Sequence, residues 1–146
     1  MSLHIAQRES EGIVILDLKG PLTLGQEDSE LRDRLAALCQ SGKVNIILNL
    51  ADVSHIDSTG LGTLVFALAR LRKAGGKLAL LHVNRTHLKL FLLTKLAIAF
   101  EFFSDEHDAI DSFFPDRELK HFDVLDFVEH EQDRESAHGV SSPTPC

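Results

Sequence analysis

A strand pattern that leads into an amphipathic helix pattern is the feature that most restricts how this chain folds. Residues 44–50 are mostly apolar, and residues 57–62 read Asp-Ser-Thr-Gly-Leu-Gly. Apolar side chains then recur at the three- and four-residue spacing of a helix, at Leu61, Leu64, Val65, Leu68 and Leu71. The pattern predicts a strand-to-helix junction that carries the hydroxyl group of Ser58 at the start of the helix.

The same alternation of patterns runs along most of the chain. Strands are expected near residues 4–8, 13–18, 44–50, 77–83 and 99–103, and helices near 26–40, 59–74, 85–94 and 105–114. The turn over residues 9–12 makes the first strand pair an antiparallel hairpin, and the inner strands are apolar enough to be covered on both faces. We therefore predict an α/β sandwich whose four- to five-stranded sheet is mostly parallel, with an antiparallel N-terminal edge strand and about four helices.

The predicted junction at Ser58 has two interpretations. The first N–H groups of a helix lack partners and the helix dipole is positive there, so the junction suits an N-cap side chain and equally a phosphoryl group. Asp or Ser before a helix is more often a cap. In a parallel sheet, binding sites gather at the carboxyl ends of the strands, which places the expected loop over residues 51–58 near the turn over residues 84–86.

Charge divides the chain into two parts near Pro115. Residues 1–115 hold 14 acidic and 12 basic side chains, whereas residues 116–146 hold 8 acidic and 3 basic ones. We expect one domain over residues 1–115 and an acidic extension over 116–146. In the extension, apolar residues recur every three positions at Leu119, Phe122, Leu125 and Val128. That spacing is typical of a short helix over 117–130, docked on the domain or on a partner, before a tail of disordered character.

Composition limits the expected location of the protein and the molecules that it binds. Cys39 and Cys146 give no disulfide framework, and the start of the chain has no signal-peptide pattern, so a cytoplasmic location is expected. The apolar runs are far shorter than the roughly 18 residues of a membrane-spanning helix. The net charge of −7 argues against nonspecific binding to nucleic acids or anionic membranes.

Catalytic signals are weak. His55, Asp57 and Ser58 are the residue types of a hydrolytic triad, but they are nearly adjacent, whereas triad geometry needs separate elements. Ile56 replaces the first glycine of a nucleophile elbow. The eight histidines show no metal-ligand spacing. We expect no enzyme, no metal and no cofactor.

Residues 49–62 resemble the signature of the STAS domain family, which is shared by sulphate-transporter tails and bacterial anti-sigma factor antagonists. The resemblance extends from about residue 13 to residue 114. Residues 20–22 match the turn after the early strand, residues 75–78 match the end of the second long helix, and residues 94–96 match the end of the third helix.

The resemblance implies an anti-sigma factor antagonist that works as a switch. The serine matching Ser58 is phosphorylated by the partner anti-sigma factor, a serine kinase of the histidine-kinase-like ATPase fold. The unphosphorylated form sequesters that kinase, and a serine phosphatase resets the cycle. The partner surface would include Asp57, Thr59, Gly60, Leu61, Thr23 and Arg85, although helical spacing also fits Leu61 to the core.

One departure and two alternatives accompany this interpretation. Many antagonists carry an aspartate where this chain has Thr23, so a carboxylate near the serine is missing. STAS domains also serve as non-switching scaffold subunits of signalling or lipid-transport assemblies. Some relatives are thought to bind purine nucleotides, which is the weaker alternative.

Overall fold

The computed structural model describes residues 3–23 and 26–115, so the expected helix over 117–130 and the tail lie outside the described residues. Its elements are β1 (His4–Ser10), β2 (Ile13–Leu22), α1 (Gln26–Gln40), β3 (Asn45–Ile56), α2 (Ser58–Lys73), β4 (Lys77–Leu81), α3 (Arg85–Leu93), β5 (Glu101–Phe103) and α4 (Glu106–Asp111). All the expected strands and helices of residues 4–114 are present, and α1 has the expected bounds.

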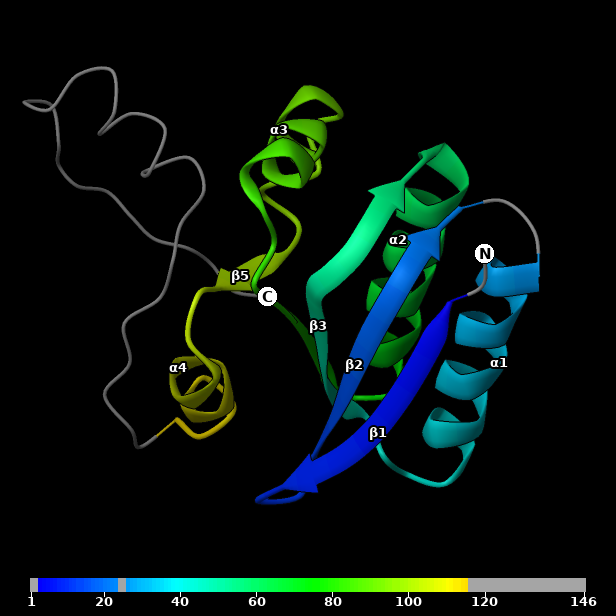
Figure 1. The fold of residues 1–146 in the computed structure, drawn as a ribbon. Coiled ribbons are helices and arrows are strands. Elements are labelled where there is room, and N and C mark those ends of the chain that lie inside the picture. Colours follow the sequence, from blue (N-terminus) through cyan, green and yellow to red (C-terminus); the bar gives the residue numbers. More distant parts are fainter. Residues whose placement is uncertain (1–2, 24–25, 116–146) are drawn as a thin grey trace, which may run out of the picture.

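The strands form one sheet in the order β1-β2-β3-β4-β5. β1 is antiparallel to β2, and the other neighbours are parallel. Glu11 and Gly12 join β1 to β2 with φ values of 56° and 81°, as a two-residue hairpin turn with positive φ at both positions requires. α1 and α2 cover one face of the sheet and α4 lies on the other (Figure 1). The predicted mostly parallel α/β fold is confirmed.

Two apolar cores hold these layers together. The larger one joins α1, α2 and α3 to one face of the sheet and includes Leu31, Leu64, Leu68 and Phe91. The smaller one lies under α4 and joins Ala109 and Ile110 to β2, β3, β4 and β5. Leu64 and Leu68 are buried, as their spacing predicts. Val65 departs from the predicted apolar stripe, because its side chain is 36% exposed on the outer face of α2.

β2 and β3 are longer than predicted. Residues 20–22 were expected to form a turn, but they continue β2, and Leu22 pairs with Ile56 at the end of β3. The register shifts beside Gly20, whose φ of 111° favours glycine. Pro21 is tolerated because β1 pairs with β2 only as far as Lys19, which leaves one side of β2 without a partner strand there. Residues 51–56 are therefore strand, although they were expected to form a loop.

Other boundaries differ by a few residues. β4 ends at Leu81 because His82 leaves the extended conformation with a φ of 59°. β5 begins at Glu101 because Ala99 lies in a turn, where its N–H donates to the carbonyl of Leu96. α4 is shorter than the expected helix over 105–114, since Ser112 is its C-cap.

Candidate functional site

The tip of the β2–β3 pair extends beyond the rest of the sheet and carries the predicted junction. The last pair between β3 and β4 is Asn49 with Leu81, whereas β3 continues beside β2 as far as Ile56. Figure 1 shows this tip meeting the start of α2. Thr23 follows β2 directly, so it lies beside the junction, and its side chain is partly exposed.

Asp57 caps α2, and Ser58 is the first residue of the helix. The backbone of Asp57 is extended, and its Oδ1 accepts a 2.9 Å hydrogen bond from the N–H of Gly60. Its carbonyl accepts a further 2.9 Å bond from the N–H of Leu61. Of the two roles open to the junction, the cap therefore belongs to Asp57 and not to Ser58. Ser58 is exposed, and its hydroxyl has no recorded hydrogen bond within the described residues.

The first turn of α2 lies against the end of β2, and this contact requires glycine at position 60. A Cβ on Gly60 would lie 2.0 Å from the carbonyl oxygen of Leu22. The N–H of Asp57 donates to the same oxygen at 3.4 Å. Gly62 differs, because a Cβ there would meet nothing within 4 Å. Of these two glycines, Gly62 alone leaves open space on the outside of the helix.

The remaining predicted partner residues differ in accessibility. Leu61 is 5% exposed and belongs to the larger core, which agrees with the core interpretation of its spacing. Thr59 is partly exposed in the first turn of α2. Arg85 is exposed and is the first residue of α3, where Asn84 is the N-cap and accepts a 2.8 Å bond from the N–H of His87.

Three residues that the sequence analysis did not select connect α1 to the site. Thr63 donates its hydroxyl hydrogen to the carbonyl of Thr59 at 3.2 Å and accepts a 3.3 Å bond from Nε of Arg32. The Arg32 guanidinium lies 5.1 Å from the ring centroid of Phe66. Thr63 is fully buried although polar, and these two bonds satisfy its hydroxyl. The four-residue spacing of the two threonines is visible in the sequence, but the contact with Arg32 depends on how the two helices pack.

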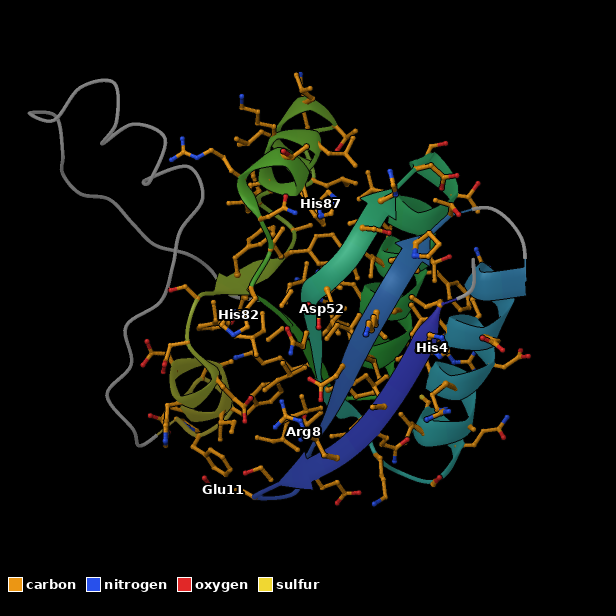
Figure 2. All side chains as sticks on the ribbon, in the orientation of Figure 1. His4, Arg8, Glu11, Asp52, His82 and His87 are labelled. Atoms are coloured by element: carbon orange, nitrogen blue, oxygen red, sulfur yellow. The ribbon has the colours of Figure 1, made fainter. Side chains whose placement is uncertain are left out.

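His87 on α3 and His55 on β3 influence each other near the same tip. His87 is 6% exposed, and Figure 2 shows it between α3 and the end of β3. Burial lowers the pKa of His87, and the charge of His55 on β3 lowers it further. Its Nδ1 has no hydrogen-bond partner within the described residues. The lowered pKa favours the neutral form of His87 at neutral pH.

Neither a metal centre nor a membrane-spanning helix is found within residues 3–23 and 26–115. No group of three or more His, Cys, Asp or Glu side chains in these ranges is arranged to hold a metal ion. No helix there is long and apolar enough to cross a bilayer. The candidate site is thus an exposed hydroxyl beside a capped helix N-terminus.

Comparison with known proteins identifies the family. The family model described as the STAS domain matches residues 4–109. The chain belongs to the STAS domain family. The STAS domain match covers nearly all the described residues, from β1 into α4. The expected domain over residues 1–115 is not tested by it and stays a prediction.

Named relatives and solved structures agree with this assignment. The anti-sigma-B factor antagonist of Bacillus subtilis (strain 168) is 29% identical over 96 residues, which are 66% of this chain and 86% of that protein. The Thermotoga maritima protein tm1081 has the same fold, with a TM-score of 0.71 at 24% identity over 75% of this chain and 93% of that one. The Bacillus cell fate determinant SpoIIAA, solved in its phosphorylated form, has a TM-score of 0.61 at 23% identity over 75% of this chain and 98% of that one.

Proposed function

We propose that this STAS domain is an anti-sigma factor antagonist whose contact with an anti-sigma factor kinase is switched by phosphorylation of Ser58. The observation that carries the proposal is that Asp57 and Ser58 have different roles at the start of α2. Asp57 supplies the cap, so the exposed hydroxyl of Ser58 has no structural task within the described residues and is accessible to a kinase. The name of the Bacillus subtilis relative supports the antagonist role.

The electrostatics of the junction suit a switch that leaves the fold intact. A phosphoryl group adds about −1.5 to −2 charges at neutral pH. The positive end of α2 offsets part of that charge, and the first turn of α2 contains no acidic side chain after the cap. The added charge would then lie beside Asp57 on the surface. A partner surface complementary to a neutral hydroxyl would lose its contact through charge and bulk.

The partner surface that we propose combines Ser58 with residues from three segments of the chain. Thr23 lies at the end of β2, Thr59 and the open space beside Gly62 lie on α2, and Arg85 begins α3. Leu61 and Gly60 would act by shaping the turn rather than by direct contact, because both are buried. The partner we propose is a serine kinase of the histidine-kinase-like ATPase fold, with a serine phosphatase that reverses the reaction. In this proposal the STAS domain is the substrate and binding partner, and it performs no catalysis itself.

The test uses the full chain with its cognate kinase and ATP. We expect Ser58→Ala to bind the kinase and to resist phosphorylation, and Ser58→Asp to bind more weakly than the wild-type chain. Pull-down measures binding, and phosphopeptide mass spectrometry locates the phosphate. Ser54 provides the matched control, since it is an exposed serine on β3 four residues before Ser58. Ser54→Asp adds the same charge nearby and should bind like the wild-type chain.

Two results would contradict the proposal. Phosphate on Thr59 alone would place the switch at the wrong hydroxyl. Equal binding by Ser58→Ala and Ser58→Asp would favour a non-switching STAS scaffold subunit of a signalling or lipid-transport assembly.

A further inference from the structure

The most exposed large apolar side chains of the described residues lie together in sequence at the end of α3. Leu93 is 81% exposed and Ile98 is 75% exposed, compared with 36% for Val65 and 39% for Phe66. Leu93 is the last residue of α3, and Ile98 lies in the turn that leads to β5. Neighbouring apolar side chains with this much exposure are typical of an interaction surface. Leu93 and Ile98, five positions apart, therefore indicate such a surface at the end of α3.

Basic side chains surround this end of α3. Lys89 precedes Leu93 by one helical turn, and Lys95 lies between Leu93 and Ile98. Arg72, in the last turn of α2, donates a 3.2 Å hydrogen bond to the carbonyl of Ala99 and so lies beside the same turn. We refer to Arg72, Lys89, Leu93, Lys95 and Ile98 as the α3 patch.

The charge of the α3 patch is not neutralised locally. The chain has no acidic residue from Asn84 to Phe100. Within the described residues, neither Lys89 nor Lys95 has a recorded ion-pair partner, and both side chains are exposed. The patch therefore offers apolar contact and positive charge together, and it fits an acidic segment with regularly spaced apolar residues.

The chain itself contains a segment of that chemistry after the described domain. Between residues 117 and 130, Leu119, Phe122, Leu125 and Val128 recur every three positions, with Asp123 and Asp126 among them. We propose that residues 117–130 dock on the α3 patch of the same chain, with these apolar side chains on Leu93 and Ile98 and the carboxylates beside Lys89 and Lys95.

Chain length and charge favour the same chain as the occupant. Four extended residues after Pro115 carry Leu119 as far as roughly 14 Å, and seven carry Phe122 as far as roughly 25 Å. The second distance is about twice the radius of gyration of roughly 13 Å expected for a domain of about 100 residues. α4, which precedes the segment, packs on the opposite face of the sheet from α3, and the chain can pass from one face to the other around the edge strand β5. Tethering also raises the effective concentration of the segment to the millimolar range. The net charge of −7 opposes both a second copy and an anionic membrane. The docking does not depend on the role of Ser58.

The test compares amide NMR spectra of the full chain with and without the apolar side chains of the segment. In the Phe122→Ser, Leu125→Ser variant, we expect the amide signals of residues 89–98 to shift and those of α1 to stay unchanged. Val140→Ser is the matched control, because it removes an apolar residue of the same extension outside 117–130, and it should shift none of the α3 signals. Leu93→Ser should shift the signals of residues 117–130 from the other side of the contact.

A charge exchange tests the pairing directly. Lys89→Glu with Lys95→Glu should release the segment, and adding Asp123→Lys with Asp126→Lys should restore the wild-type pattern over residues 117–130. Unchanged signals of residues 89–98 in the Phe122→Ser, Leu125→Ser variant would overturn the proposal. Shifts that grow with protein concentration would also overturn it, because the occupant would then be a second copy. Binding to phosphatidylserine vesicles that Leu93→Ser abolishes would identify a lipid surface instead.

Discussion

The starts of α2 and α4 use the same capping chemistry for two purposes. Asp57 caps α2 by accepting the N–H of Gly60 at 2.9 Å, and Asp105 caps α4 by accepting the N–H of Asp108 at 3.1 Å. In both helices the residue after the cap is the first helical residue, Ser58 in α2 and Glu106 in α4. The two helix starts therefore differ mainly in what the first side chain does.

In α4 that first side chain, Glu106, forms an ion pair that joins α4 to the sheet. Arg8 of β1 donates to both carboxylate oxygens of Glu106, at 2.9 and 2.8 Å, and also pairs with Asp17 of β2. The hydrogen bonds from Arg8 lower the pKa of Glu106 and that of Asp17. α4 shows that a negative charge can follow a capping aspartate when a cation lies within reach. At Ser58 no such partner is recorded within the described residues, so a phosphoryl group there would remain available to other molecules.

Substitution at the third helical position is expected to change the free energy of unfolding most. It is Asp108 in α4 but Gly60 in α2, where a Cβ would lie 2.0 Å from the carbonyl oxygen of Leu22. We expect Gly60→Ala to lower the free energy of unfolding by more than about 4 kcal/mol, because the clash is with backbone that also pairs with β3. Urea unfolding measures the change.

Gly62→Ala is the control for that comparison, since the space around Gly62 is open. Alanine there should raise the free energy of unfolding by up to about 1 kcal/mol through its higher helix propensity. Similar losses in the two variants would show that α2 does not approach β2 as closely as described.

The next prediction concerns how firmly α2 is held by its core. Leu64 is fully buried, whereas Val65 beside it is 36% exposed. Leu64→Ala should lower the free energy of unfolding by about 2–5 kcal/mol, the usual result of emptying a buried leucine site. Val65→Ala should change it by less than about 0.5 kcal/mol. Equal effects would mean that α2 presents a different face to the sheet.

The sequence predicted the parts of this molecule that depend on local patterns. The period of apolar residues located α1 and the buried face of α2, and the fourteen-residue stretch around Ser58 led to the correct family. The tip of β2 and β3 was predicted as turn and loop, the turn from the family resemblance, and Gly20 and Pro21 do normally interrupt strands. The absence of a partner strand beyond Lys19 makes them acceptable, and that absence is a property of the whole sheet.

Long-range contacts were the part that patterns could not supply. Nothing near Arg8 in the sequence indicates that it meets Glu106, which lies 98 positions away. The bond from Arg32 to Thr63 likewise depends on the packing of two helices. The exposure of Val65 shows the same limit, since the helical spacing could not tell which edge of the apolar stripe faces solvent.

Removing either cap should have a smaller effect than Gly60→Ala or Leu64→Ala. Asp57→Ala and Asp105→Ala should each lower the free energy of unfolding by about 1 kcal/mol, the typical value for an N-cap. Hydrogen exchange should then show faster exchange at Gly60 in the first variant and at Asp108 in the second. Unchanged exchange at Gly60 in Asp57→Ala would indicate that another group caps α2.

The Arg8 ion pairs should contribute at most about 1 kcal/mol, because all three side chains are about one-third exposed or more. The lowered pKa values of Asp17 and Glu106 mean that this contribution is present above their ordinary values of 3.8 and 4.5. It is lost as the pH falls through the lowered folded-state values. The difference in unfolding free energy between wild type and Arg8→Met should therefore be constant near neutral pH and shrink in acid. A difference that grows in acid would contradict this assignment.

The smallest expected effect on the free energy of unfolding is that of Ser58→Glu, and it bears directly on the proposed switch. Ser58→Glu gives α2 the Asp-Glu start that α4 already has, but within residues 3–23 and 26–115 no cation is recorded at Ser58 as Arg8 is at Glu106. The positive helix terminus favours the new charge while Asp57 opposes it, so the free energy of unfolding should change by less than about 0.5 kcal/mol. Glu106→Ser, the reverse exchange at α4, should lower it by up to about 1 kcal/mol because the Arg8 ion pair is lost. A loss above about 2 kcal/mol in Ser58→Glu would show that α2 cannot hold a charge at its first residue. Phosphorylation would then act by loosening the helix, and not at the surface that the partner contacts.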